Sequence, residues 1–147
     1  MLLAVLYGMI FFFSAEDGTR SSAVSARVTK ALVSGYCGLM GKGAETVAEM
    51  VMLLEGIVRK LAHFLEYMCV GLLSFSIVAL WRGVSRRGAL AVLLQVFISA
   101  ALDELHQYFV PGRWASFKDV LIDTAGGLAG ILVIVLCIRC FAWKTSQ

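Results

Sequence analysis

The stretch ALDELHQYFVPGR, residues 101–113, decides how this chain folds. It closes an apolar run with four polar side chains, and the Pro-Gly pair after them is typical of a tight turn. The four side chains are Asp103, Glu104, His106 and Gln107. Such groups are costly in hydrocarbon unless they have partners. The stretch is therefore either a solvated helix end or a polar site between helices.

The composition identifies a membrane protein. Of the 147 residues, 60% are hydrophobic and only 16% are charged, which fits one domain covering residues 1–147 but not a soluble one. The net charge of +3 is small, and no basic patch interleaved with aromatic residues occurs, so we exclude a nucleic-acid-binding protein. The four cysteines lack metal-ligand spacing and imply no disulfide framework.

Three segments are long and apolar enough to cross a bilayer as helices, at about 61–81, 89–110 and 118–142. Residues 1–14 are also apolar, but as a helix they reach only about 20 Å of a core about 30 Å thick. They lack the basic start and cleavage site of a signal peptide, so we interpret them as a short or truncated first span. The sequence thus predicts an all-α integral membrane bundle of four transmembrane helices.

The basic residues predict the orientation in the cell membrane. The segment WRGVSRRG, residues 81–88, carries three arginines and no acid, which indicates a cytoplasmic loop. With four spans, both termini are then cytoplasmic, in agreement with Arg139 and Lys144 at the end of the last span. The polar ends of the other spans would meet near the outer face.

Residues 14–58 are then extracellular. Apolar residues recur at helical spacing over 24–32 and again over 47–61. We expect two amphipathic helices on the membrane surface, separated by the glycine-rich residues 34–44. The alternative is a linker helix packed on the bundle.

Helical spacing of three and four gathers polar residues on one face of each span. On the second span these are Arg59, His63, Glu66 and Tyr67. On the third they are Asp103, His106 and Gln107. On the fourth they are Asp119 and Asp123, which share their face with Gly126 and Gly130, a small-residue spacing that lets helices approach closely.

Two carboxylates are expected to differ from their neighbours. Glu104 lies about 100° from Asp103 around the helix and should face a different neighbour. Asp123 lies nearly a turn deeper than Asp119 and needs a partner or a proton there, with His63 or His106 as the candidate partner.

Simpler structural roles exist for several of these residues. His63 and Glu66 can form only an intrahelical pair, and Lys60 can extend to the interface. Asp119, three residues after Ser116, fits a capping box.

Arg113 directly follows the Pro-Gly turn and precedes a helix. Its guanidinium beside free backbone N–H groups is suited to a phosphate or carboxylate headgroup. We therefore expect Arg113 to matter more than Lys60, which can extend freely. The alternative is nonspecific anchoring to lipid phosphates.

Three blocks of the sequence resemble the VanZ-like family of small bacterial membrane proteins, named for a teicoplanin-resistance protein. They are FSAEDGTRS, RKLAHFLEY and DELHQYFVPGRWASFKDVLIDTAGGLAG, and the resemblance runs over most of the chain. The sequence departs from the family pattern at Asp123, where Asn is usual. The family's motif residues fall on Lys60, His63, Tyr67, Asp103, Glu104, His106, Gln107, Pro111, Gly112, Arg113, Asp119 and Gly126. The resemblance implies four transmembrane helices and an accessory role in glycopeptide resistance, but no established reaction.

Two functions fit these observations. In the first, the site binds a lipid-linked or acylated anionic ligand at the outer leaflet, such as a lipid-linked cell-wall precursor or a lipoglycopeptide, with membrane lipids as further partners. The ligand-binding residues would be Arg59, Lys60, His63, Tyr67, Asp103, Glu104, His106, Gln107, Arg113 and Asp119.

In the second, the protein is an intramembrane hydrolase or transferase acting on a lipid-linked cell-envelope substrate. Nitrogen and oxygen ligands suit a divalent metal, and a histidine–carboxylate pair suits acid–base catalysis. No diagnostic spacing assigns a metal or another cofactor. The candidates are His63, Glu66, Asp103, His106, Asp119 and Asp123.

Overall fold

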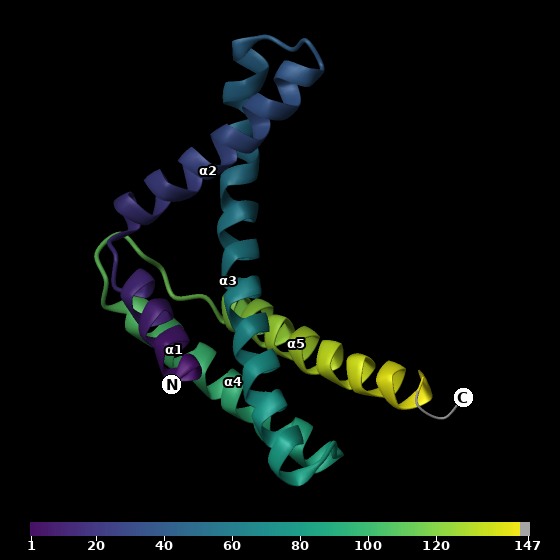
Figure 1. The fold of residues 1–147 in the computed structure, drawn as a ribbon. Coiled ribbons are helices and arrows are strands. Elements are labelled where there is room, and N and C mark those ends of the chain that lie inside the picture. The colour runs from purple at the N-terminus through teal and green to yellow at the C-terminus, as the bar shows by residue number, and fades with distance from the viewer. Residues whose placement is uncertain (145–147) are drawn as a thin grey trace.

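A computed structural model describes residues 1–144 of the chain. All regular elements of these residues are α-helices, joined by short connecting segments (Figure 1). The helices are α1 (Leu2–Ser14), α2 (Gly18–Leu39), α3 (Ala44–Arg82), α4 (Arg86–Tyr108) and α5 (Phe117–Lys144). Three of them, α3, α4 and α5, are long and apolar enough to cross a membrane. A fourth span exists if the bent pair of α1 and α2 counts as one. The predicted all-α membrane fold is confirmed.

Helix α3 is the longest element and runs the full height of the molecule (Figure 1). Its 39 residues extend roughly 58 Å, almost twice the thickness of the hydrocarbon core. The first expected amphipathic helix is α2, whereas the second is not separate, because residues 44–58 continue into the span without a break. Helix α2 packs against this upper part of α3.

An elbow at residues 15–17 turns the chain by 107° between α1 and α2. Asp17 begins α2 as its N-cap, because its carboxylate accepts a hydrogen bond from the Arg20 backbone N–H at 2.8 Å. The Thr19 hydroxyl donates to the same oxygen at 2.6 Å. The motif SAEDGTR therefore encodes a sharp change of direction.

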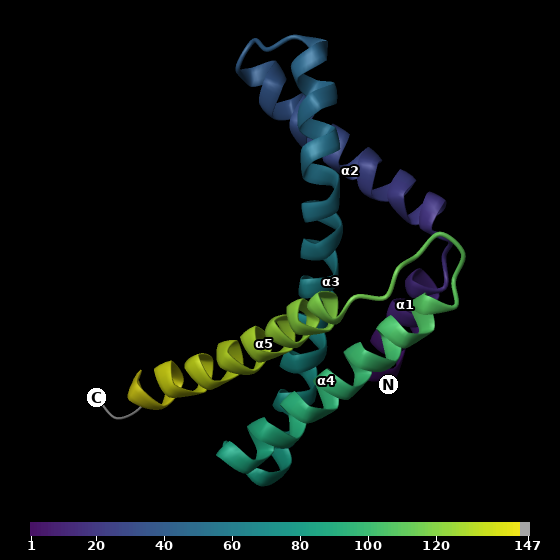
Figure 2. The same cartoon turned by 180° about the vertical axis from the view of Figure 1, so that it is seen from behind.

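The closest helix crossing joins α3 and α5, which also make the most extensive contact between described helices. A Cβ placed on Gly126 would collide with the backbone carbonyl of Phe64, and one on Gly130 with that of Met68. On the other side, a Cβ on Gly71 would collide with the carbonyl of Gly127. The predicted small-residue contact thus brings the two backbones together, as the crossing in Figure 2 shows.

The lower half of the molecule holds the core. Buried side chains of α1, α3, α4 and α5 form one cluster, which includes Tyr67, Phe75 and Val96. Within it, the Tyr7 hydroxyl lies 3.0 Å from the hydroxyl of Ser99, and the Gln95 side-chain amide donates to Tyr7 at 3.0 Å. These hydrogen bonds join the short helix α1 to α4.

Candidate functional site

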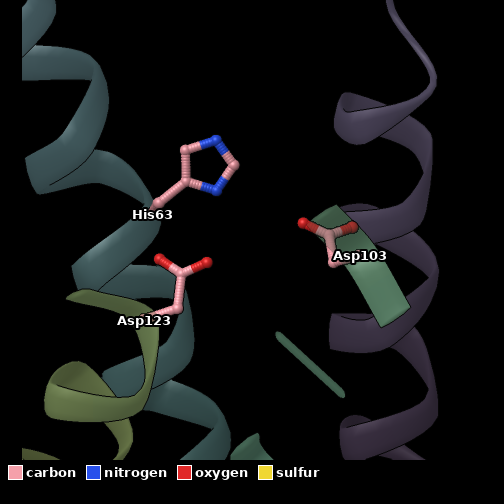
Figure 3. Close-up of side chains that lie close together, drawn as sticks. All are labelled: His63, Asp103 and Asp123. Carbon is pink, nitrogen blue, oxygen red and sulfur yellow. The ribbon is translucent and has the colours of Figure 1, made fainter. Parts of the chain in front are cut away.

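The site lies where α3, α5 and the end of α4 meet. His63 of α3, Asp103 of α4 and Asp123 of α5 each offer one ligand atom, and these atoms all lie within 4.8 Å of one another. Figure 3 shows His63 and Asp123 on one side, facing Asp103 across a gap. The expectation that Asp103 joins His63 and Asp123 across helices is therefore confirmed, and Asp103 does not belong to a solvated helix end.

Asp123 is the most deeply placed of the three. It is 1% exposed, and neither of its carboxylate oxygens has a hydrogen-bond partner among the described residues. The Nδ1 atom of His63 is buried and unpartnered as well, with Glu66 3.8 Å away at Oε2. The His63–Glu66 pair is therefore too long for a hydrogen bond.

Asp103 is held in place by its own helix. The Gln107 side-chain amide donates to Asp103 Oδ2 at 3.0 Å and lies 3.4 Å from the hydroxyl of Ser14 at the end of α1. Both Asp103 and Gln107 are buried. Their shared face is the one that spacing predicted, and Gln107 fixes the orientation of the carboxylate.

Glu104 faces a different neighbour, as expected. Its carboxylate accepts a hydrogen bond from the Ser116 backbone N–H at 2.8 Å, next to the start of α5. Asp119, one turn into α5, pairs with Lys60 of α3 at 2.6 Å. Lys60 therefore does not extend freely, because it joins α3 to α5 beside the site.

His106 departs from the expectation that it shares the site with Asp103. Its ring stacks on Phe11 of α1, with ring centroids 4.7 Å apart, and its buried Nε2 has no hydrogen-bond partner. Tyr67 is also placed differently, since it is 1% exposed within the core cluster. Neither residue lines the cavities described below.

Arg113 fastens the α4–α5 loop to the elbow. Its Nε donates to the backbone carbonyl of Glu16 at 3.0 Å and its Nη2 to that of Phe13 at 2.9 Å. Burial lowers the pKa of this guanidinium and the nearby Asp103 opposes that shift, but arginine stays charged at neutral pH. The guanidinium was expected to bind an anion. In the structure, its Nε and Nη2 atoms instead donate to two backbone carbonyls at the end of α1.

A second contact completes this junction. The backbone N–H of Gly18 donates to the carbonyl of Pro111 at 3.0 Å, and a Cβ on Gly18 would collide with the backbone of Gly112. Gly112 itself has a φ of 74°, which favours glycine. The SAEDGTR and PGR motifs, about 95 residues apart, therefore form one structural unit.

Two neighbouring cavities open beside His63, and Asp123 lines the first of them. The first, of about 320 Å³, has a strongly charged lining that includes Arg59, Lys60, His63, Glu104, Arg113, Asp119 and Asp123. The second, of about 240 Å³, has apolar walls from Phe13, Val24, Val28 and Val58, with Arg59, His63 and Glu66 among its polar residues. Ser21, Arg59, His63 and Arg113 line both.

Fold and site together define a multi-pass α-helical membrane protein with a buried polar site between its helices. The family model described as VanZ/LLP1 matches residues 1–138, and the chain belongs to this family. No curated protein and no solved structure matches the chain.

The sequence reasoning missed the residues that act through their backbone or through α1. Ser116 donates a backbone N–H to Glu104. Ser14 contacts Gln107 and Phe11 stacks on His106, both from α1, whose position was not predictable. Gly18 was not singled out, although its place directly after the N-cap residue Asp17 in a turn-like motif was a usable indication of a close contact.

Proposed function

We propose that the protein binds the anionic head of a lipid-linked or acylated ligand at the outer leaflet, and that it is an accessory to glycopeptide resistance. One observation carries this: a charged cavity and an apolar cavity share four lining residues, Arg59 among them. An amphiphilic molecule has the same two parts side by side. Resemblance to a teicoplanin-resistance family supports the proposal, because teicoplanin carries an acyl chain.

Arg59 is the cation best suited to the head group. Its Nη1 makes only a 3.3 Å hydrogen bond to the Ser22 hydroxyl, whereas Lys60 is paired with Asp119 and Arg113 binds two backbone carbonyls. It lines both cavities at their common wall. A phosphate there would gain a charge-assisted hydrogen bond without breaking another ion pair.

We expect Arg59→Gln to weaken binding of undecaprenyl phosphate to the purified protein by roughly ten- to a hundredfold, since a hydrogen bond to a charged group contributes about 1.5–3 kcal/mol. Native mass spectrometry of the protein in nanodiscs would measure it, with undecaprenol as the probe that lacks phosphate. Arg27→Gln on the exposed face of α2 is the control. Equal binding of both probes, or equal losses in the two variants, would refute recognition of the head group.

In cells, expression should raise resistance to teicoplanin more than to a glycopeptide without an acyl chain. Arg59→Gln at equal expression should remove most of that difference. Identical susceptibility of cells with and without the protein would contradict a role in glycopeptide resistance while leaving the binding result intact.

We also propose that both termini and the α3–α4 loop face the cytoplasm, on the basis of the arginines at 82, 86 and 87. Ser85 caps α4 through Gly88, so Val84, 47% exposed, is the better position for a cysteine. In a background without native cysteines, Val84→Cys should resist an impermeant thiol reagent in intact cells and react after permeabilisation. Labelling in intact cells would reverse the topology and move the site to the inner face.

A second candidate is an intramembrane hydrolase or transferase acting on a lipid-linked cell-envelope substrate. The observation that favours it is Asp123, whose free carboxylate oxygens lie beside His63 at the wall of the charged cavity. Such a pair can take and return a proton. Turnover of a lipid-linked phosphate substrate that Asp123→Asn abolishes, with binding retained, would establish this function over the first.

A further inference from the structure

Two carboxylates approach each other inside the helix bundle, and no described lysine or arginine forms an ion pair with either of them. Asp103 and Asp123 are both buried, and each offers an oxygen within 4.8 Å of the other and of a His63 nitrogen. Of the cations around the site, Lys60 pairs with Asp119, Arg113 donates to backbone carbonyls and Arg59 donates to the Ser22 hydroxyl. Buried charges of one sign are strongly unfavourable, so this arrangement requires a cation or a proton.

We propose that His63, Asp103 and Asp123 bind a divalent transition-metal ion, such as Zn²⁺ or Mn²⁺. One imidazole nitrogen and two carboxylate oxygens are ligands these ions accept, and the histidine disfavours Ca²⁺ or Mg²⁺. With metal–ligand bonds of about 2.0–2.2 Å, ligand atoms in neighbouring positions around such an ion lie roughly 3–3.5 Å apart. The observed spacing of at most 4.8 Å therefore requires side-chain rotations that bring these atoms closer by up to about 1.5 Å.

The surroundings of the three residues agree with a metal centre. Gln107 donates to Asp103 and fixes its orientation, as groups around metal ligands commonly do. Asp123 leaves both oxygens without a hydrogen-bond partner, although the residue is 99% buried. His63 and Asp123 both line the charged cavity of about 320 Å³, so remaining coordination positions of the ion would open toward it. A phosphate or water in that cavity would complete the coordination.

A proton shared between Asp103 and Asp123 is the competing occupant, and metal measurements separate the two. The purified protein, stripped with a chelator and then dialysed against Mn²⁺ or Zn²⁺, should hold one ion per chain by elemental analysis. The bound Mn²⁺ should show coupling to a histidine nitrogen in electron spin-echo spectroscopy. A wild-type protein that takes up no metal would refute the proposal and leave the shared proton.

Variants locate the ion. His63→Ala and Asp123→Asn should each lose the bound ion and the metal-dependent rise in melting temperature. His106→Ala is the matched control, because the chain has only two histidines and this one stacks on Phe11. Asp119→Asn is the carboxylate control, since Asp119 has Lys60 as its cation. Both controls should retain the ion, and its loss from the controls or its retention in both site variants would overturn the assignment.

Two further readouts keep the result interpretable. Asp123→Asn should fold, because a buried neutral amide is less costly than an unpaired carboxylate, and its melting temperature without metal should equal or exceed that of the stripped wild type. The metal assay uses protein without any lipid ligand. Failure of the metal site would therefore leave undecaprenyl phosphate binding unaffected, and failure of that binding would leave the metal result standing.

Discussion

Replacing Gly126 with leucine should separate α5 from α3 and lower the melting temperature of the purified protein by roughly 5–10 °C, because overpacking costs about 1–3 kcal/mol or more. Even a Cβ at this position would collide with the backbone carbonyl of Phe64, and a carbonyl in a helix cannot rotate aside as a side chain can. The two backbones must move apart instead. Since Asp123 lies three residues before Gly126, its contact with His63 would be lost with the crossing.

The matched control is Gly56→Leu, on the upper part of α3. A Cβ at Gly56 would meet nothing within 4 Å, and leucine is a better helix former than glycine by somewhat under 1 kcal/mol. The control should therefore melt at the same or a slightly higher temperature. Differential scanning fluorimetry in detergent, with circular dichroism for helix content, measures both variants. Equal melting temperatures for the two leucine variants would show that the α3–α5 crossing is not a close backbone contact.

The transmembrane helices were predictable because apolar length is a strong constraint in a bilayer. The expected spans at 89–110 and 118–142 correspond to α4 at Arg86–Tyr108 and α5 at Phe117–Lys144. The unbroken course of α3 was not predictable from periodicity. Its pattern changes from amphipathic to apolar near residue 58, but no proline or glycine pair interrupts the helix there, so it continues.

The candidate site also contains residues whose positions could be predicted from the sequence and residues whose contacts could not. Asp103, His63 and Asp123 could be brought together from helical spacing and the order of the spans, although His106 was an equal candidate as the partner of Asp123. The contacts of His106 and Arg113 could not be predicted, since their partners lie in or just after α1, 95 to 100 residues away in the sequence. Apolarity places α1 near the bundle but says nothing about which helix it contacts.

Arg113→Ala should destabilise the junction between α1 and the α4–α5 loop more than Lys60→Ala destabilises the α3–α5 contact. Arg113 makes two hydrogen bonds to backbone carbonyls at the end of α1. Their loss removes the side-chain donor of the Glu16 carbonyl and leaves the Phe13 carbonyl with the backbone N–H of Glu16 at 3.3 Å. A charged hydrogen bond contributes about 1.5–3 kcal/mol, and because the bond to Phe13 is exposed to water we expect a total cost of about 2–4 kcal/mol. The Lys60–Asp119 pair is partly exposed and is worth about 0–1 kcal/mol.

Amide hydrogen exchange of α1 is the direct measurement. Arg113→Ala should reduce the exchange protection of residues 10–18 by roughly thirty- to several hundredfold. This is the fold-change in the opening equilibrium that corresponds to a loss of about 2–4 kcal/mol. Arg113→Lys should recover only part of it, because an ammonium cannot reproduce the two-donor edge that spans both carbonyls. If Arg113 instead served only to clamp an anion, Arg113→Ala would lose ligand binding with α1 fully protected. That outcome would assign the guanidinium to the ligand and not to the fold.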